Sequence, residues 1–137
     1  MALLWPDGDK KGWPVRTVPV CVNTVQFPVP SAARTYRLGE SIGKAVRSWE
    51  SDAKVLLVGT GGLSHQLDGE RAGFINKKFD LDFLESLTTG DPKWATKFST
   101  TELVEQVGTQ GIELLMWLAT RAAMGEKVSK VHMNYHI

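Results

Sequence analysis

Residues 53–58 read AKVLLV, and residues 59–71 directly after them read GTGGLSHQLDGER. A short, continuous apolar run of this kind is typical of a β-strand that is covered on both faces. The polar, glycine-rich segment after it would then be a loop at the carboxyl end of that strand, the edge where open α/β sheets usually bind ligands. These two segments predict an α/β fold and place its functional site in the loop.

The segments on either side extend this prediction. Residues 15–25 (VRTVPVCVNTV) and 127–137 (KVSKVHMNYHI) are predicted strands, and Pro19 indicates an edge or a bulge in the first of them. The helices are predicted at residues 31–48 with Ser31 as the cap, at 76–88, at 99–108 with a capping box from Ser99 to Glu102, and at 110–124. Alternating strands and helices predict a central sheet flanked by helices.

The composition is that of a soluble globular domain and argues against a nucleic-acid or membrane partner. The 137 residues are 42% hydrophobic and carry a formal net charge of +1, with no basic run. The longest apolar stretch, residues 114–119, is too short to cross a bilayer.

Cysteine usage and the two ends of the chain bear on its location and completeness. The lone Cys21 excludes an intrachain disulfide, is predicted to be a small core residue, and favours a reducing cytoplasm. Residues 1–6 (MALLWP) lack the regions of a signal peptide, which also predicts a cytoplasmic protein. Both ends are apolar and have no polar tail, so the chain is predicted to be part of a larger α/β domain.

His65 is the first candidate for catalysis. It lies in the glycine-rich loop, where backbone can approach a ligand closely, and imidazoles in clefts transfer protons near neutral pH. The alternative is a loop histidine that is hydrogen-bonded to nearby backbone.

Glu113 is the second candidate. It is the only ionisable residue between Glu105 and Arg121, and its sequence neighbours are apolar. A buried carboxylate there would need a cation, a metal or a proton. Alternatively, it lies in the first turn of its helix, where the helix dipole favours a negative charge and the side chain faces water.

Two weaker patterns point to other chemistry. His132 and His136 share one side of a strand or helix, but without cysteines or a spaced carboxylate they are interpreted as half-buried strand histidines, not zinc ligands. Residues 59–62 (GTGG) begin like a dinucleotide-binding fingerprint, yet Ser64 replaces the third glycine and no helix follows to receive a pyrophosphate.

The longest motif resembles one family closely. Residues 58–77 (VGTGGLSHQLDGERAGFINK) look like the signature loop of the protocatechuate 4,5-dioxygenase β-subunit and gallate dioxygenase family, which are class III extradiol ring-cleaving dioxygenases. Residues 108–118 (GTQGIELLMWL) resemble a second block of that family, and residues 19–31 and 134–137 resemble further ones. The resemblance implies that residues 1–137 are the C-terminal part of a single α/β catalytic domain, without its N-terminal half and extreme C-terminus.

The resemblance also implies a site and a reaction. The family's iron(II) is held by two histidines and one glutamate. Glu113 matches that glutamate and His65 matches the acid/base histidine, whereas the histidine ligands belong to the absent N-terminal half. The implied reaction is extradiol cleavage of a catechol acid such as protocatechuate or gallate by O2, in aromatic compound degradation. The implied protein partners are a small α-type subunit or fused domain and further copies in a homo-oligomer.

Two alternatives stay open. One predicted iron ligand cannot hold the metal alone, so the chain by itself is also interpreted as a non-catalytic fragment or a subunit-binding module. A nucleotide-binding α/β module rests only on the partial glycine motif.

Overall fold

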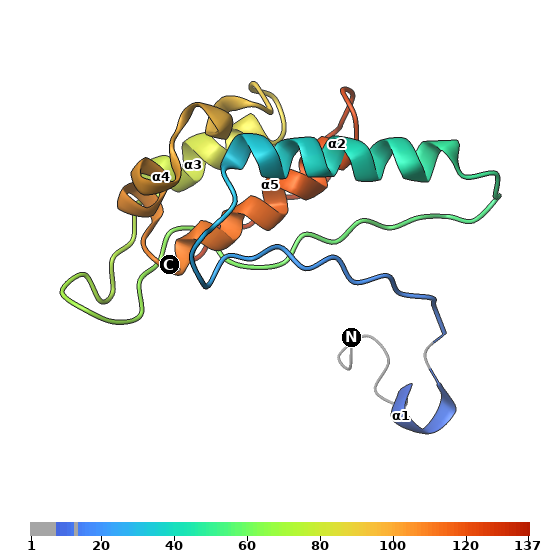
Figure 1. The fold of residues 1–137 in the computed structure, drawn as a ribbon, viewed down its shortest axis with the longest axis horizontal. Coiled ribbons are helices and arrows are strands. Elements are labelled where there is room, and N and C mark those ends of the chain that lie inside the picture. Colours follow the sequence, from blue (N-terminus) through green and yellow to red (C-terminus); the bar gives the residue numbers. More distant parts are fainter. Residues whose placement is uncertain (1–7, 13) are drawn as a thin grey trace.

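The computed structural model describes residues 8–12 and 14–137, and all of its regular structure is helical (Figure 1). The interpretation of residues 1–6 lies outside this part of the chain. The elements in chain order are α1 (Gly8–Lys11), α2 (Ala32–Ser48), α3 (Lys77–Ser86), the short 3₁₀ helix η1 (Trp94–Lys97), α4 (Thr100–Val107), the 3₁₀ turn η2 (Gly111–Glu113) and α5 (Leu114–Ala123).

The predicted helices are confirmed, and their first turns show why. The Ser31 side chain caps α2, and the Asn76 side chain caps α3 by accepting from Phe79 N at 3.2 Å. At α4, the Ser99 hydroxyl accepts from Glu102 N at 3.2 Å, and the Glu102 carboxylate accepts from Ser99 N at 2.7 Å. These caps satisfy amide groups that have no partner within the helix, and they depend only on neighbouring residues.

Helices α2 and α5 cross in direct contact (Figure 1). A β-carbon on Gly39 would lie 2.1 Å from the Ala119 carbonyl oxygen, and one on Gly43 would lie 2.3 Å from that of Ala123. Glycine weakens an isolated helix. Here it allows two helix backbones to touch, so the two glycines of α2 serve the packing.

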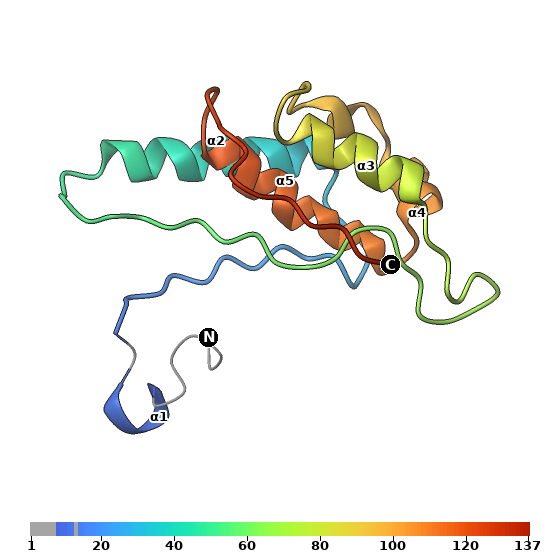
Figure 2. The ribbon, with the colours of Figure 1, turned by 180° about the vertical axis from the view of Figure 1, so that it is seen from behind.

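The rest of the core joins α3, η1 and α4 to one end of α5 (Figures 1 and 2). The Phe79 ring of α3 packs on Trp94 and Phe98, with centroids 5.1 and 5.5 Å away. The α5 side chains Leu114 and Leu118 are fully buried in the same core cluster. This end of α5 forms a rigid base for the loop that contains His65.

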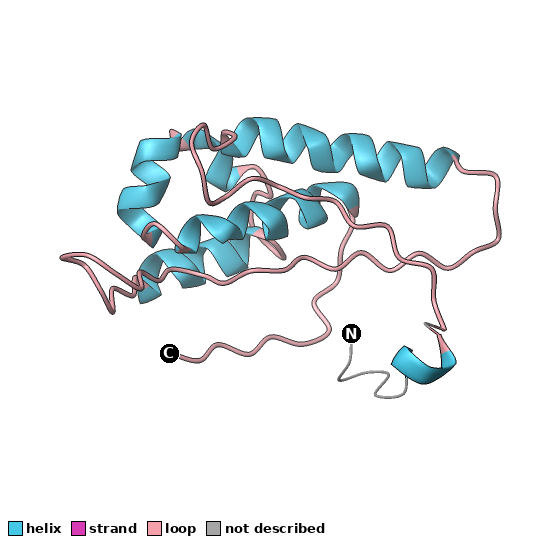
Figure 3. Ribbon diagram, turned by 60° about the horizontal axis from the view of Figure 1, so that its bottom comes forward, coloured by secondary structure: helices cyan, strands magenta, loops and turns pink. Residues whose placement is uncertain are grey.

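The predicted central sheet is wrong for the described residues, and with it the α/β fold class. Residues 15–25, 53–58 and 127–137 run as long coil segments with no backbone hydrogen bonds to one another (Figure 3). Their apolar side chains face solvent; Leu56 is 84% exposed and Val131 is 96% exposed. An apolar pattern is only one requirement of a strand, because its N–H and C=O groups also need a neighbouring strand. Helices close their hydrogen bonds locally, so they form without such a partner.

One smaller expectation, about Cys21, also changes because the sheet is absent. Cys21 was predicted to be a core residue, but it is exposed, because no sheet covers residues 15–25. Across the described part of the chain, no helix is long and apolar enough to span a membrane.

Candidate functional site

The loop that contains His65 lies directly on the turn between α4 and α5. The His65 N–H donates to the Val107 carbonyl at 2.8 Å, and the His65 carbonyl accepts from Gly111 N at 3.1 Å. A β-carbon on Gly111 would lie 2.9 Å from His65 N and 3.0 Å from the Leu63 carbonyl oxygen. Only glycine lets the loop backbone come this close, so the position of His65 is set by the η2 turn.

The imidazole of His65 has a defined hydrogen bond. Its Nδ1 lies 2.8 Å from the Leu63 carbonyl oxygen. A carbonyl only accepts, so Nδ1 carries the hydrogen, and in the neutral ring Nε2 keeps its lone pair. The half-buried ring therefore has one nitrogen held by the loop and one available as a proton acceptor.

Glu113 is held by the same loop. It is the last residue of η2, directly before α5, and it is half-buried. Its Oε2 accepts from Gly62 N at 3.0 Å. A β-carbon on Gly62 would lie 3.0 Å from His65 Cε1 and 4.0 Å from Glu113 Oε2, so the two side chains flank this glycine. The structure thus brings both predicted site residues together.

A metal could use Glu113, but this part of the chain does not complete a metal site. Within residues 8–12 and 14–137, no group of three or more His, Cys, Asp or Glu side chains is placed to hold a metal ion. The Glu113 Oε1 atom has no hydrogen bond in the described structure, so the carboxylate suits one coordination position. His132 and His136 are both exposed, so their predicted half-buried state in a strand is wrong.

A surface hollow of about 340 Å³ lies beside His65, and we call it the His65 hollow. The loop, α3, α5 and the C-terminal segment all contribute to its wall. The lining includes Ser64, His65, Asp80, Trp117, Tyr135 and His136. Trp117 Nε1 is buried and has no hydrogen-bond partner in the described chain.

The whole chain, residues 1–137, matches the family described as the catalytic LigB subunit of aromatic ring-opening dioxygenase. The chain belongs to this family. The match confirms the resemblance drawn from the loop motif.

Two curated relatives show how much of a LigB protein this chain represents. It is 39% identical to gallate dioxygenase from Pseudomonas putida over 127 residues, which are 93% of this chain and 37% of that protein. It is 28% identical to 2,3-dihydroxyphenylpropionate/2,3-dihydroxicinnamic acid 1,2-dioxygenase from Rhodococcus jostii over 153 residues, covering 80% of this chain and 48% of that protein. The chain thus spans less than half the length of either relative.

Sequence reasoning missed Asp80, which lines the same hollow as His65. Asp80 is 1% exposed and accepts hydrogen bonds from Ser64 and Tyr135. A signal was present, because Asp80 shares helical spacing with the apolar residues Phe83, Leu84 and Leu87 of the same helix face. Burial, together with the hydrogen bond and charge of Asp80, raises the pKa of Tyr135 to about 12.

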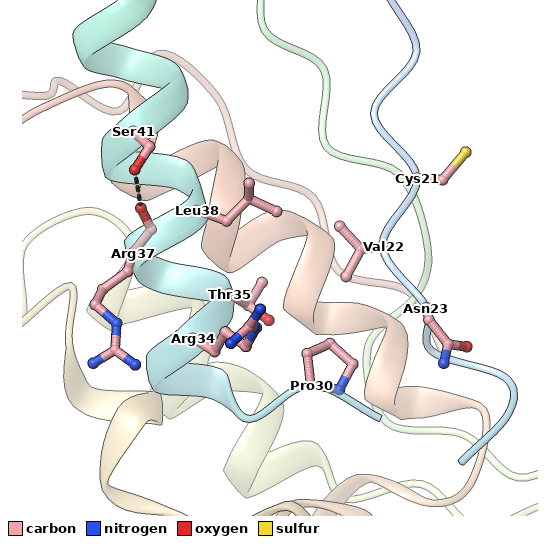
Figure 4. Close-up of a pocket in the computed structure, with 9 residues that line it drawn as sticks. All are labelled: Cys21, Val22, Asn23, Pro30, Arg34, Thr35, Arg37, Leu38 and Ser41. Atoms are coloured by element: carbon pink, nitrogen blue, oxygen red, sulfur yellow. Dashed lines mark hydrogen bonds between the residues drawn. The ribbon is translucent and has the colours of Figure 1, made fainter. Parts of the chain in front are cut away.

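A second hollow, of about 420 Å³, lies between residues 21–30 and α2 (Figure 4). Arg34, Thr35 and Leu38 line it from α2, and Val22 faces them from the coil segment. None of the predicted site residues lines it. The two predicted site residues therefore lie away from this second hollow, and His65 lines the first one.

Proposed function

We propose that this chain is the C-terminal part of a catalytic domain that cleaves the ring of a catechol acid, such as protocatechuate or gallate, outside its two hydroxyls. The reaction would use iron(II) and O2. The main support is that one loop holds two different groups side by side: Gly62 N–H binds the Glu113 carboxylate, and the same loop contains the His65 imidazole. The names of the relatives, which include a gallate dioxygenase, support the substrate class.

The roles of the two residues follow from their chemistry. Bound iron(II) would act as a Lewis acid that holds both substrates and favours loss of the catechol protons. Glu113 would hold the metal through its carboxylate, whose orientation is fixed by the hydrogen bond from Gly62. His65 would accept a catechol proton at Nε2, because its Nδ1–H is already held by Leu63, and would return a proton later in the reaction.

Residues outside this chain would complete the metal site. The described residues would supply one carboxylate, Glu113, to the metal, so two histidine ligands would come from an N-terminal part of the same domain. The exposed apolar side chains of residues 53–58 support the idea that further protein covers them. We propose in addition a cytoplasmic location, a homo-oligomer, and a small α-type subunit or fused domain near the site.

The test measures turnover by the complete protein that is encoded by the reading frame containing this chain. The protein is loaded with iron(II) without oxygen, mixed with gallate or protocatechuate, and then given O2. Uptake of one O2 per catechol with formation of a conjugated, ring-opened acid is expected, and the 137-residue chain alone should form none. Failure of the complete protein with every catechol acid tested would refute the function. Turnover by the chain alone would refute the assignment of the missing ligands.

A further inference from the structure

Asp80 is a buried carboxylate whose hydrogen bonds converge on the His65 hollow. Its Oδ1 accepts from Ser64 N at 2.8 Å, and its Oδ2 accepts from the Ser64 hydroxyl at 2.7 Å and from the Tyr135 hydroxyl at 2.9 Å. No lysine or arginine of the described residues forms an ion pair with it. A buried charge is costly unless donors surround it, and an apolar residue would often stabilise a core equally well. The arrangement therefore points to a role beyond stability.

The donors of Asp80 lie on two walls of the hollow. Ser64 immediately precedes His65, and both its N–H and its hydroxyl are bound to Asp80, so the direction of the loop is fixed one residue before the imidazole. Tyr135 belongs to the C-terminal segment that runs along α5 (Figure 2). One carboxylate thus sets the separation of the loop from the C-terminal segment across the hollow.

Helix α3 has other attachments, so Asp80 is not needed to hold it in place. The Asn76 side chain donates to the Gln106 carbonyl at 3.0 Å, which joins α3 to α4. Phe79 and Phe83 bury their rings in the core, where Phe79 also packs on Trp94. Loss of the Asp80 carboxylate should therefore displace the loop and the C-terminal segment more than the helix.

We propose that Asp80 is a positioning residue that holds the His65 imidazole in its reactive place through Ser64 and closes the hollow through Tyr135. This proposal rests on the proposed function, in which His65 moves a proton of the substrate. A general base must lie within hydrogen-bond reach of its proton, and a displacement of about 1 Å reduces a rate on the order of 10²-fold.

The test is Asp80→Asn in the complete protein, with Asp82→Asn as the matched control. Asp82 lies on the same helix, but its side chain is 43% exposed and pairs with Lys78 at 2.7 Å. Asp80→Asn keeps the size of the side chain but removes its charge and one of its two acceptor oxygens. The remaining oxygen can still accept from Ser64 N, while the Ser64 and Tyr135 hydroxyls then face an NH2 group to which they cannot donate. We expect kcat to fall roughly 10–100-fold, with KM and iron content changed by less than about threefold, because only the position of the base changes. The control should behave like the wild type.

A second readout does not depend on turnover. The imidazole N–H signal of His65, followed by NMR, should shift and exchange faster with water in Asp80→Asn, and should be unchanged in Asp82→Asn. Ser64→Ala removes one of the three bonds to Asp80 and also the acceptor of the Asn76 N–H, which lies 2.7 Å from the Ser64 hydroxyl. It should change the His65 signal in the same direction to a smaller degree, which keeps the test open if Asp80→Asn fails to fold. Normal kcat and an unchanged His65 signal in both Asp80→Asn and Ser64→Ala would overturn the proposal. If the wild type opens no catechol ring, the proposed function fails, while the His65 signal still decides the positioning role.

Discussion

Replacing Gly111 by alanine should damage the site more than the fold. The added β-carbon would lie 2.9 Å from His65 N and 3.0 Å from both the Leu63 carbonyl oxygen and Ser64 Cα. All three contacts are with backbone, which cannot rotate away as a side chain can. The loop must therefore move off the η2 turn, and the hydrogen bonds that His65 makes to Val107 and Gly111 must lengthen.

The size of the effect follows from these contacts. Overpacking of a tight contact lowers the free energy of unfolding by about 1–3 kcal/mol. A shift of the imidazole by a fraction of an ångström up to 1 Å should lower kcat roughly 10–100-fold. Urea unfolding and steady-state turnover of the complete protein, with a catechol acid as substrate, measure the two quantities.

Gly39→Ala is the comparison that separates the site from the fold. Its β-carbon would lie 2.1 Å from the Ala119 carbonyl oxygen, so α2 and α5 must separate. The gain of about 1 kcal/mol in helix propensity offsets only part of that cost. Gly39→Ala should lose stability at least as much as Gly111→Ala, yet keep nearly normal kcat where it is folded. If Gly111→Ala is normal in both measurements, or if Gly39→Ala loses kcat equally, the close contact at Gly111 does not position His65.

Two further predictions concern local hydrogen bonds. In the 137-residue chain, Tyr36→Phe leaves Tyr135 as the one tyrosine. The ultraviolet titration of Tyr135 should then have its midpoint near the folded-state pKa of about 12, and Asp80→Asn should move that midpoint toward the unfolded value of about 10. Because folding raises the pKa of Tyr135, the stabilising contribution of its neutral phenol is fully present below about pH 10 and is lost as the pH rises through 12. A titration midpoint near 10 in the protein with Asp80 intact would contradict the hydrogen bond between Tyr135 and Asp80. Ser99→Ala should lower the free energy of unfolding by about 1 kcal/mol through loss of the α4 cap, and an unchanged urea midpoint would show that the cap contributes nothing.

The helices were predictable from the sequence because their determinants are local. Ser31, Asn76 and Ser99 each accept a hydrogen bond from an amide three residues ahead, and apolar spacing then sets the buried face. The predicted strands have no such local determinants, and the described residues do not form them. Residues 53–58 have the apolar run of a buried strand, but a sheet depends on pairing with segments far away in sequence or outside the chain.

The residues of the candidate site differ in the same way: some were predictable from local sequence and others were not. His65 was predicted from its glycine-rich loop, and Glu113 from its isolation among apolar residues, and the structure places them on either side of Gly62. The loop does not follow a strand, so its position comes from Gly111 and from Asp80. Asp80 belongs to no motif, and its helical spacing indicated only that it lies on the apolar face of its helix. The contact of Tyr135 with Asp80 joins residues that lie 55 positions apart, and no local pattern predicts such a bond.

Glu113 and His65 are proposed to share one site but to have different roles, and a comparison of Glu113→Gln with His65→Gln in the complete protein separates those roles. Iron content and the rate of ring opening are determined on the same samples. Glu113→Gln removes the charge that would hold the metal, so iron and activity should be lost together. His65→Gln should keep its iron and still bind catechol without oxygen, while turnover falls about 10²–10⁴-fold. Loss of iron in His65→Gln, or full iron and normal turnover in Glu113→Gln, would contradict the account.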